Sequence, residues 1–186
     1  MTAPELGHAL LTIARSAIAE RLGLGPLDQI KHAALQQHFA TFVTLRKTGQ
    51  LRGCIGSLQA VRPVAVDVRE NALAAAFHDP RFVPLAAGEF ESTSVEVSLL
   101  SAAERVHVAS EEELLTRLRP GVDGVILEYG RHRATFLPQV WEALSDPREF
   151  LAALKQKAGL PEAFWHAQLS VSRYVVTKWA DLDFAF

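Results

Sequence analysis

One short segment of the sequence carries the residue types best suited to chemistry. Leu51–Ser57 reads Leu-Arg-Gly-Cys-Ile-Gly-Ser and contains Cys54, the only cysteine among 186 residues. A thiolate is a nucleophile, and a nearby cation raises its fraction above the few per cent of an ordinary cysteine at about pH 7. Glycine is used where backbone must approach another group closely or where a side chain would block access. We therefore interpret this segment as the wall of a site, with Cys54 as the candidate catalytic nucleophile.

The two reactive side chains of this segment also have structural interpretations. Unpaired cysteine often behaves as a small buried hydrophobe, and no histidine lies at a spacing that marks it as a general base for Cys54. Histidines that can approach in space are His78, His107 and His132. Arg52 either binds an anionic group of a substrate or pairs with an acidic residue such as Glu96 on a neighbouring strand. Both alternatives stay open for each residue.

Other candidate substrate-binding residues surround these two. They are Gly53, Gly56, Ser57, Asp79, Arg81 and Glu96. Asp79 and Arg81 belong to an Asp-Pro-Arg corner, which either lines a site or stops a helix while its charges cap and pair locally. For Asn71, a helical position beside the core predicts a hydrogen bond to a nearby loop.

Composition excludes several classes of function. The 19 basic and 21 acidic side chains give a net charge of −2, which argues against strong nonspecific nucleic-acid binding. A single cysteine can form neither an intramolecular disulfide nor a four-thiolate zinc site. No paired-histidine motif lies on a predicted helix, and no phosphate loop or dinucleotide fingerprint is present. We predict no intrinsic metal and no cofactor.

Hydropathy and the N-terminal residues bear on localisation. No apolar run approaches the roughly 20 residues that span a bilayer. The first residues also lack the basic and apolar regions of an export signal. The sequence therefore predicts a cytoplasmic protein that does not enter a membrane.

Apolar spacing and turn residues predict a mixture of helices and strands. Helices are expected over residues 4–22, 28–37, 63–78, a short stretch from 111, 141–144, 148–158 and 162–166. Strands are expected over 94–100 and 170–179, and as hairpins over 39–47 with 50–57 and 125–129 with 134–137. Because side chains alternate along a strand, Arg52 and Cys54 should share one face, while Leu51 and Ile55 point to the core.

Five stretches in order and spacing identify relatives. They are Leu51–Ser57, Asn71–Phe77 leading into Asp79–Phe82, Val95–Leu100, Asp123–Val125, and Phe136–Val140 followed by Lys157–Leu160. This pattern resembles the AMMECR family, found from archaea to animals. The resemblance implies one AMMECR-type domain of α+β fold, with two unequal subdomains, an antiparallel sheet flanked by helices in each, and a cleft between them. The larger subdomain would comprise about 1–102 plus 169–186, and the smaller inserted one about 103–168.

The resemblance also implies a functional context. The family is similar to one member of a three-protein set, the AmmeMemoRadiSam system, which includes a Memo-type relative of extradiol dioxygenases and a radical S-adenosylmethionine enzyme. A substrate-binding or presenting component acting with these two partners is the favoured function. The alternative is an enzyme that modifies a sizeable substrate in the interlobe cleft with Cys54 as nucleophile. An RNA or a protein substrate is compatible with either hypothesis.

Overall fold

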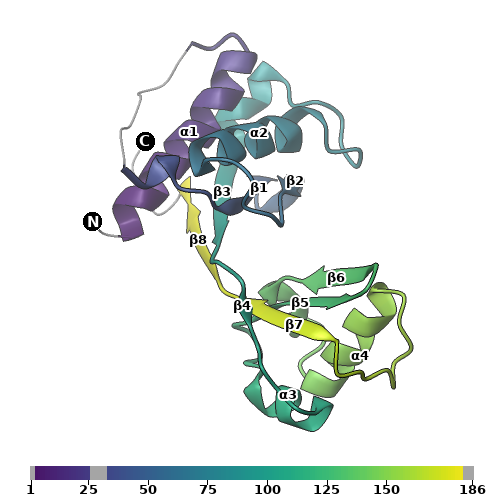
Figure 1. Cartoon of the computed structure of the whole chain (residues 1–186). Helices are drawn as coiled ribbons and strands as arrows, with labels where there is room; N and C mark the ends of the chain where they lie inside the picture. Colours follow the sequence, from purple (N-terminus) through teal and green to yellow (C-terminus); the bar gives the residue numbers. More distant parts are fainter. Residues whose placement is uncertain (1–2, 26–32, 182–186) are drawn as a thin grey trace. The chain divides into compact units, whose positions relative to one another are not determined.

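The chain forms two compact units, each built on its own sheet. The computed structural model describes residues 3–25 and 33–181. The first unit comprises Met1–Leu100 and Thr177–Phe186, and the second comprises Ser101–Val176. Their four-stranded antiparallel sheets have the orders β2-β1-β3-β8 and β4-β7-β5-β6 (Figure 1). The predicted α+β class with two antiparallel sheets is confirmed.

The sheet of the first unit begins with the predicted hairpin. Strands β1 (Ala40–Lys47) and β2 (Gln50–Gly56) are joined by Thr48 and Gly49. Both turn residues have positive φ, 50° and 80°, as the type I′ turn of a two-residue hairpin requires. β3 (Thr93–Leu100) pairs with the other side of β1, and β8 (Val176–Ala180) is the far edge. The edge position of β2 leaves one side of the cysteine segment free of a neighbouring strand.

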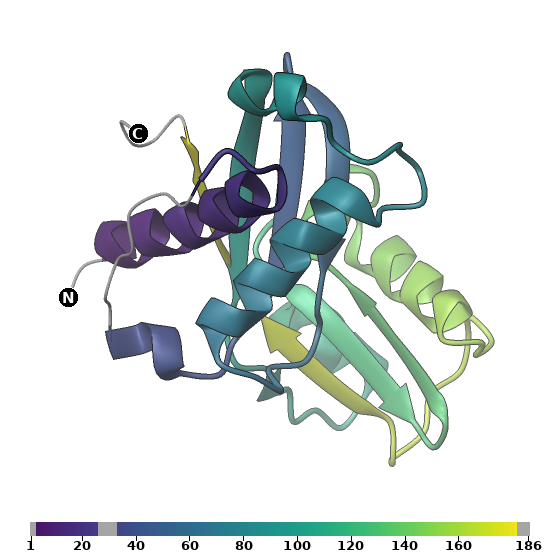
Figure 2. The same ribbon diagram turned by 90° about the horizontal axis from the view of Figure 1, so that it is seen from above.

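Two helices, α1 (Ala3–Arg21) and α2 (Val64–Phe77), cover one face of this sheet (Figure 2). Their apolar side chains form the core with Val43, Leu45 and Val97 of the strands. The predicted inner face of α2 is buried throughout, at Val64, Val68, Ala72, Ala75 and Ala76. Alanine at three of these positions allows the helix backbone to approach the sheet closely. Short 3-10 turns, η1 (Ala33–Gln36) and η2 (Ala87–Ser92), complete the unit, and part of the helix expected over 28–37 lies outside the described residues.

The second unit has β4 (Glu104–Arg105), β5 (Gly124–Tyr129), β6 (His132–Phe136) and β7 (Ser170–Tyr174). Its helices are α3 (Glu111–Arg117) and α4 (Pro147–Lys157), and the 3-10 turn η3 (Pro138–Glu142) lies between them in the sequence. Ser110 and Asp146 cap the two helices through side-chain oxygens that accept backbone N–H groups. In the core, Trp141 stacks on Phe150 with ring centroids 3.7 Å apart.

The single closing strand expected over 170–179 is wrong. The strand is interrupted at Val175. The N–H of Val175 donates to Ser101 Oγ, and its carbonyl accepts from the Ser101 N–H. β7 therefore pairs in the second sheet and β8 in the first. Both segments are half-buried strands, so both have the same alternating apolar pattern. That pattern therefore gave no sign of the break between them.

Two short helices predicted near the end of the second unit also differ. Residues 141–144 overlap a 3-10 turn that ends at Glu142, and Trp141 is fixed there because its Nε1 donates to the carbonyl of Asp123. Residues 162–166 form no helix. The Glu162 carbonyl accepts from Lys155 Nζ at 2.8 Å, and the Phe164 ring packs 4.8 Å from that of Tyr129. The Phe164 N–H still donates to the Pro161 carbonyl, so the segment makes an isolated turn that these tertiary contacts hold in place.

Candidate functional site

A β-bulge in β2 determines which way the cysteine segment faces. Arg46 lies opposite Leu51, but Leu45 lies opposite Gly53 and Thr44 opposite Cys54, so Arg52 is the extra residue. One inserted residue shifts the register and reverses the alternation beyond it. Ile55 consequently packs against the core as predicted, whereas Leu51 is 40% exposed and the prediction of a core position for it is wrong.

Arg52 is bound by an acidic residue that the sequence did not indicate. Its Nη2 and Nε donate to the two carboxylate oxygens of Glu89, at 3.0 and 3.3 Å, and its guanidinium lies 5.9 Å from the Phe82 ring. Lys47 Nζ donates to the same carboxylate at 2.9 Å. The suggested partner, Glu96, instead pairs with Lys178 at 3.6 Å across the sheet. Arg52 is therefore held in a bidentate ion pair.

The Glu89 carboxylate should make the first unit sensitive to acid. Hydrogen bonds from Arg52, then Lys47 and the Ala86 N–H, lower the pKa of Glu89 from 4.5 to about 2. Because the folded-state pKa is depressed, the stabilisation is complete above pH 4.5 and is lost as the pH falls towards 2. We expect Glu89→Gln to be less stable than the wild type at neutral pH and to lose less further stability over this range, measured by urea unfolding at each pH.

Glu91 of the same 3-10 turn supplies the matched control. Its side chain is exposed, so Glu91→Gln should keep the wild-type pH profile. Equal acid sensitivity in the wild type and Glu89→Gln would show that the ion pair with Arg52 does not contribute to this loss.

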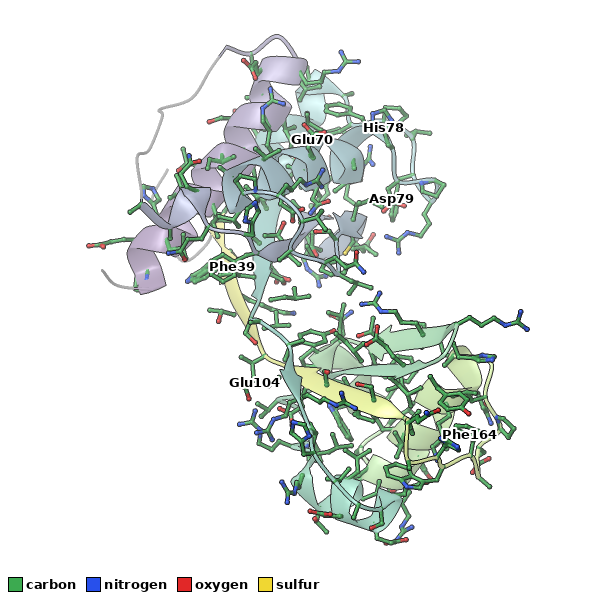
Figure 3. The ribbon with its side chains drawn as sticks, in the orientation of Figure 1. Phe39, Glu70, His78, Asp79, Glu104 and Phe164 are labelled. Carbon is green, nitrogen blue, oxygen red and sulfur yellow. The ribbon has the colours of Figure 1, made fainter. Side chains whose placement is uncertain are left out.

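Asp79 and Arg81 form a clamp on the peptide of Cys54. Asp79, which is buried beside the end of α2 (Figure 3), accepts the Cys54 N–H at 2.9 Å, and Arg81 Nη2 donates to the Cys54 carbonyl at 3.2 Å. The two side chains also bind each other at 2.7 Å. The Arg81 guanidinium, opposed in part by burial, holds the pKa of Asp79 well below its usual range. The corner residues thus replace a neighbouring strand along this edge of β2.

Cys54 is half-buried in β2. Thr44 Oγ1 donates to Sγ at 3.3 Å across the hairpin. In the described part of the first unit, no other side chain hydrogen-bonds to Sγ. Cys54 and Arg52 therefore have different partners, and the bulge at Arg52 interrupts the alternation on which the prediction of a shared face rested.

The two glycines of the segment are required by packing. A Cβ on Gly53 would lie 2.2 Å from the Ala75 carbonyl of α2, and one on Gly56 would lie 2.2 Å from the Phe42 ring. Close packing therefore explains both glycines without any need to keep the thiol accessible. Their absent side chains let a helix backbone and an aromatic ring contact β2 directly.

Ser57 belongs to a buried polar cluster around Asp67. Its Oγ donates to the Asp67 carboxylate at 2.8 Å, which also accepts from Thr41 N–H, Thr41 Oγ1 and Asn71 Nδ2. Arg62 Nε, at 2.8 Å, completes the set. Asn71 further donates to the Thr41 carbonyl, so its partner lies in strand β1 and the predicted hydrogen bond to a nearby loop is wrong. This cluster ties α2 to the start of β1 and the end of β2.

The sequence identified some members of this constellation and missed others. Cys54, Arg52, Gly53, Asp79 and Arg81 do lie together, at β2 and the segment after α2. Glu89 and Phe82 were missed, and no local signal marks Glu89, which lies 37 residues after Arg52. Thr44 was missed because an unbroken hairpin register would place Val43 opposite Cys54.

The described residues were also compared with the requirements of a metal site and of a membrane-spanning helix. Among them, no group of three or more His, Cys, Asp or Glu side chains is placed to hold a metal ion. Within the same residues, no helix is both long and apolar enough to cross a membrane.

The fold and the cysteine segment together define an α+β protein with a clamped cysteine on a sheet edge. Residues 11–179 match the AMMECR1 family model. A protein of Methanothermobacter thermautotrophicus is 39% identical over 178 residues, covering 90% of each chain, and one of Sulfolobus acidocaldarius is 36% identical over 91% of this chain and 79% of its own. The crystal structure of an uncharacterised Pyrococcus horikoshii protein matches with a TM-score of 0.77 and 32% identity, covering 95% of this chain and 91% of that one. The chain belongs to the AMMECR1 family.

Proposed function

We propose that this protein is a cytoplasmic substrate-binding or presenting component rather than a complete enzyme. The observation that carries the proposal is that the charged side chains around Cys54 are already bound to one another. Glu89 binds Arg52 and Asp79 binds Arg81. Within the described part of its unit, the thiol accepts a side-chain hydrogen bond only from the Thr44 hydroxyl. Covalent catalysis usually places a general base in contact with the nucleophile. None of the contacts just named is of that kind.

Rigidity at an exposed edge favours recognition. The clamp fixes the Cys54 peptide, and the Arg52–Phe82 contact is flanked in sequence by two exposed apolar residues, Leu51 and Val83. Val83 is 75% exposed. Apolar side chains presented on a fixed backbone support association with another protein at low entropic cost.

The identity of the partners is part of the same proposal. The family resemblance points to a Memo-type relative of extradiol dioxygenases and a radical S-adenosylmethionine enzyme. Acting on a substrate shared with them, an RNA or a protein, the chain would present that substrate and the two enzymes would supply the chemistry.

Co-purification tests the partner proposal. We expect the tagged chain, expressed with the Memo-type and radical proteins of the same genome, to retain both, and Val83→Asp to retain less than a tenth as much, since an introduced charge at an apolar contact typically costs more than about 1.4 kcal/mol. Val122, which is 45% exposed in the second unit, gives the control Val122→Asp. Failure of the wild-type chain to retain either protein would refute the proposal.

One observation favours the enzymatic alternative and gives it a separate test. A hydroxyl that donates to sulfur, as Thr44 does at 3.3 Å, stabilises a thiolate. If Cys54 is a nucleophile, iodoacetamide should react rapidly at pH 7 and Thr44→Val should slow the reaction several-fold. The binding proposal instead predicts that alkylation is slow below about pH 8, as for ordinary thiols, and that Thr44→Val changes little. Because the chain has one cysteine, a single mass shift reports the rate.

A further inference from the structure

The second unit contains a pocket whose lining residues all belong to that unit. Its volume is about 400 Å³, and its lining comprises residues 105–109, Glu113, Ala167, Leu169 and Val171. A smaller hollow of about 160 Å³ shares residues 105–107 with it. Every residue of this unit is described by the structure. Pockets that hold small molecules typically measure roughly 300–1,000 Å³, so the larger hollow is of suitable size.

The charges around this pocket are compensated, with one exception. Both oxygens of Glu113 are occupied, since they accept from Arg117 Nη2 at 2.6 Å and from the Ala109 N–H at 2.9 Å. In the smaller hollow, Arg173 lies 4.0 Å from Glu104, which Figure 3 labels on β4.

Arg105 of β4 is the exception. It has no ion pair or side-chain hydrogen bond with any residue that the structure describes, and it lines both hollows. An arginine without a carboxylate partner presents a planar set of donors that matches a carboxylate or phosphate group.

Part of the lining is apolar. Leu169 and Val171 are buried members of the core of this unit, and Val106 and Val108 pack against the same core while remaining half-buried. A carbon chain placed on these side chains would be removed from water, which is favourable in proportion to the apolar area covered. The pocket therefore offers an anion-binding group and an apolar surface together.

We propose that this pocket binds a small organic acid, with its anionic group on Arg105 and its carbon skeleton against Val108 and Leu169. A carboxylate and a phosphate monoester share the chemistry that Arg105 recognises. The inference goes beyond the proposed function and does not depend on Cys54.

Titrations of the isotope-labelled full chain test this site. Hexanoate and hexyl phosphate are the two acidic probes, and hexan-1-ol is the neutral one. Saturable amide shifts confined to residues 105–109 and 167–171 are expected for at least one acid, and the alcohol should bind at least tenfold more weakly. Comparison of the two acids shows which anionic group is preferred.

Variants separate recognition by Arg105 from general attraction. Arg105→Gln should weaken binding of the better acid about tenfold or more, the loss expected for a charge-assisted hydrogen bond. Arg133→Gln, which alters an exposed arginine of β6 paired with Glu128, should bind as the wild type does, and so should Cys54→Ser. The proposal is overturned if neither acid produces saturable shifts in this region, if hexan-1-ol binds equally well, or if the Arg105 and Arg133 variants weaken binding equally.

Discussion

Asp67→Ala is expected to destabilise the first unit by about 3–5 kcal/mol, the cost of breaking a buried ionic cluster by removing one partner. The Asp67 side chain is fully buried and accepts hydrogen bonds from four residues, which are Thr41, Ser57, Arg62 and Asn71. Its loss leaves the buried donors of Thr41 and Asn71 without their acceptor. Urea unfolding measures the effect, and faster amide exchange at Thr41 should locate it.

An exposed ion pair provides the control for this prediction. Glu20 accepts from Arg69 Nη2 at 2.8 Å, but both side chains are about half exposed, at 57% and 45%. Glu20→Gln should therefore cost no more than about 0.5 kcal/mol. A comparable loss in the two variants would mean that burial of Asp67 does not set its importance.

Gly53→Ala is expected to cost about 3 kcal/mol, near the upper end for inserting one carbon into a packed core. The new Cβ would lie 2.2 Å from the carbonyl oxygen of Ala75, which belongs to the backbone of α2 and cannot rotate away. Either α2 or β2 must shift, and a shift of β2 would also disturb the clamp on Cys54. Urea unfolding gives the stability, and amide shifts of Cys54 report the displacement.

Gly88→Ala is the matched substitution. A Cβ at Gly88 meets nothing within 4 Å, so the stability should change by less than about 0.5 kcal/mol. If Gly53→Ala is tolerated equally well, the close approach of α2 to the cysteine strand is not what requires a glycine there.

These predictions separate structural from functional roles within the Leu51–Ser57 segment. Gly53 and Gly56 admit α2 and Phe42, Ser57 binds Asp67, and Arg52 binds Glu89. Much of the segment is thus explained by packing and pairing. The half-buried Cys54 and the exposed Leu51 of the same strand are left as the residues available for function.

Local signals in the sequence were sufficient for most of the fold. Thr48-Gly49 between two β-rich runs predicted the hairpin, and the apolar face of residues 63–78 predicted which side of α2 is buried. Both depend on neighbours along the chain. Residues 170–179 are divided between two sheets at Val175, which binds Ser101, 74 residues earlier in the chain. Periodicity within the segment cannot indicate so distant a partner.

For the candidate site, the sequence by itself determined the family, the cysteine segment and the Asp79–Arg81 corner. Tertiary structure decided what each residue does. A one-residue bulge set Thr44 rather than Val43 opposite Cys54, Glu89 captured Arg52, and α2 imposed the glycine at 53. The physical reason is that residue type and spacing encode backbone preferences over a few residues. Hydrogen-bond partners and close contacts, in contrast, are fixed only when distant segments pack together.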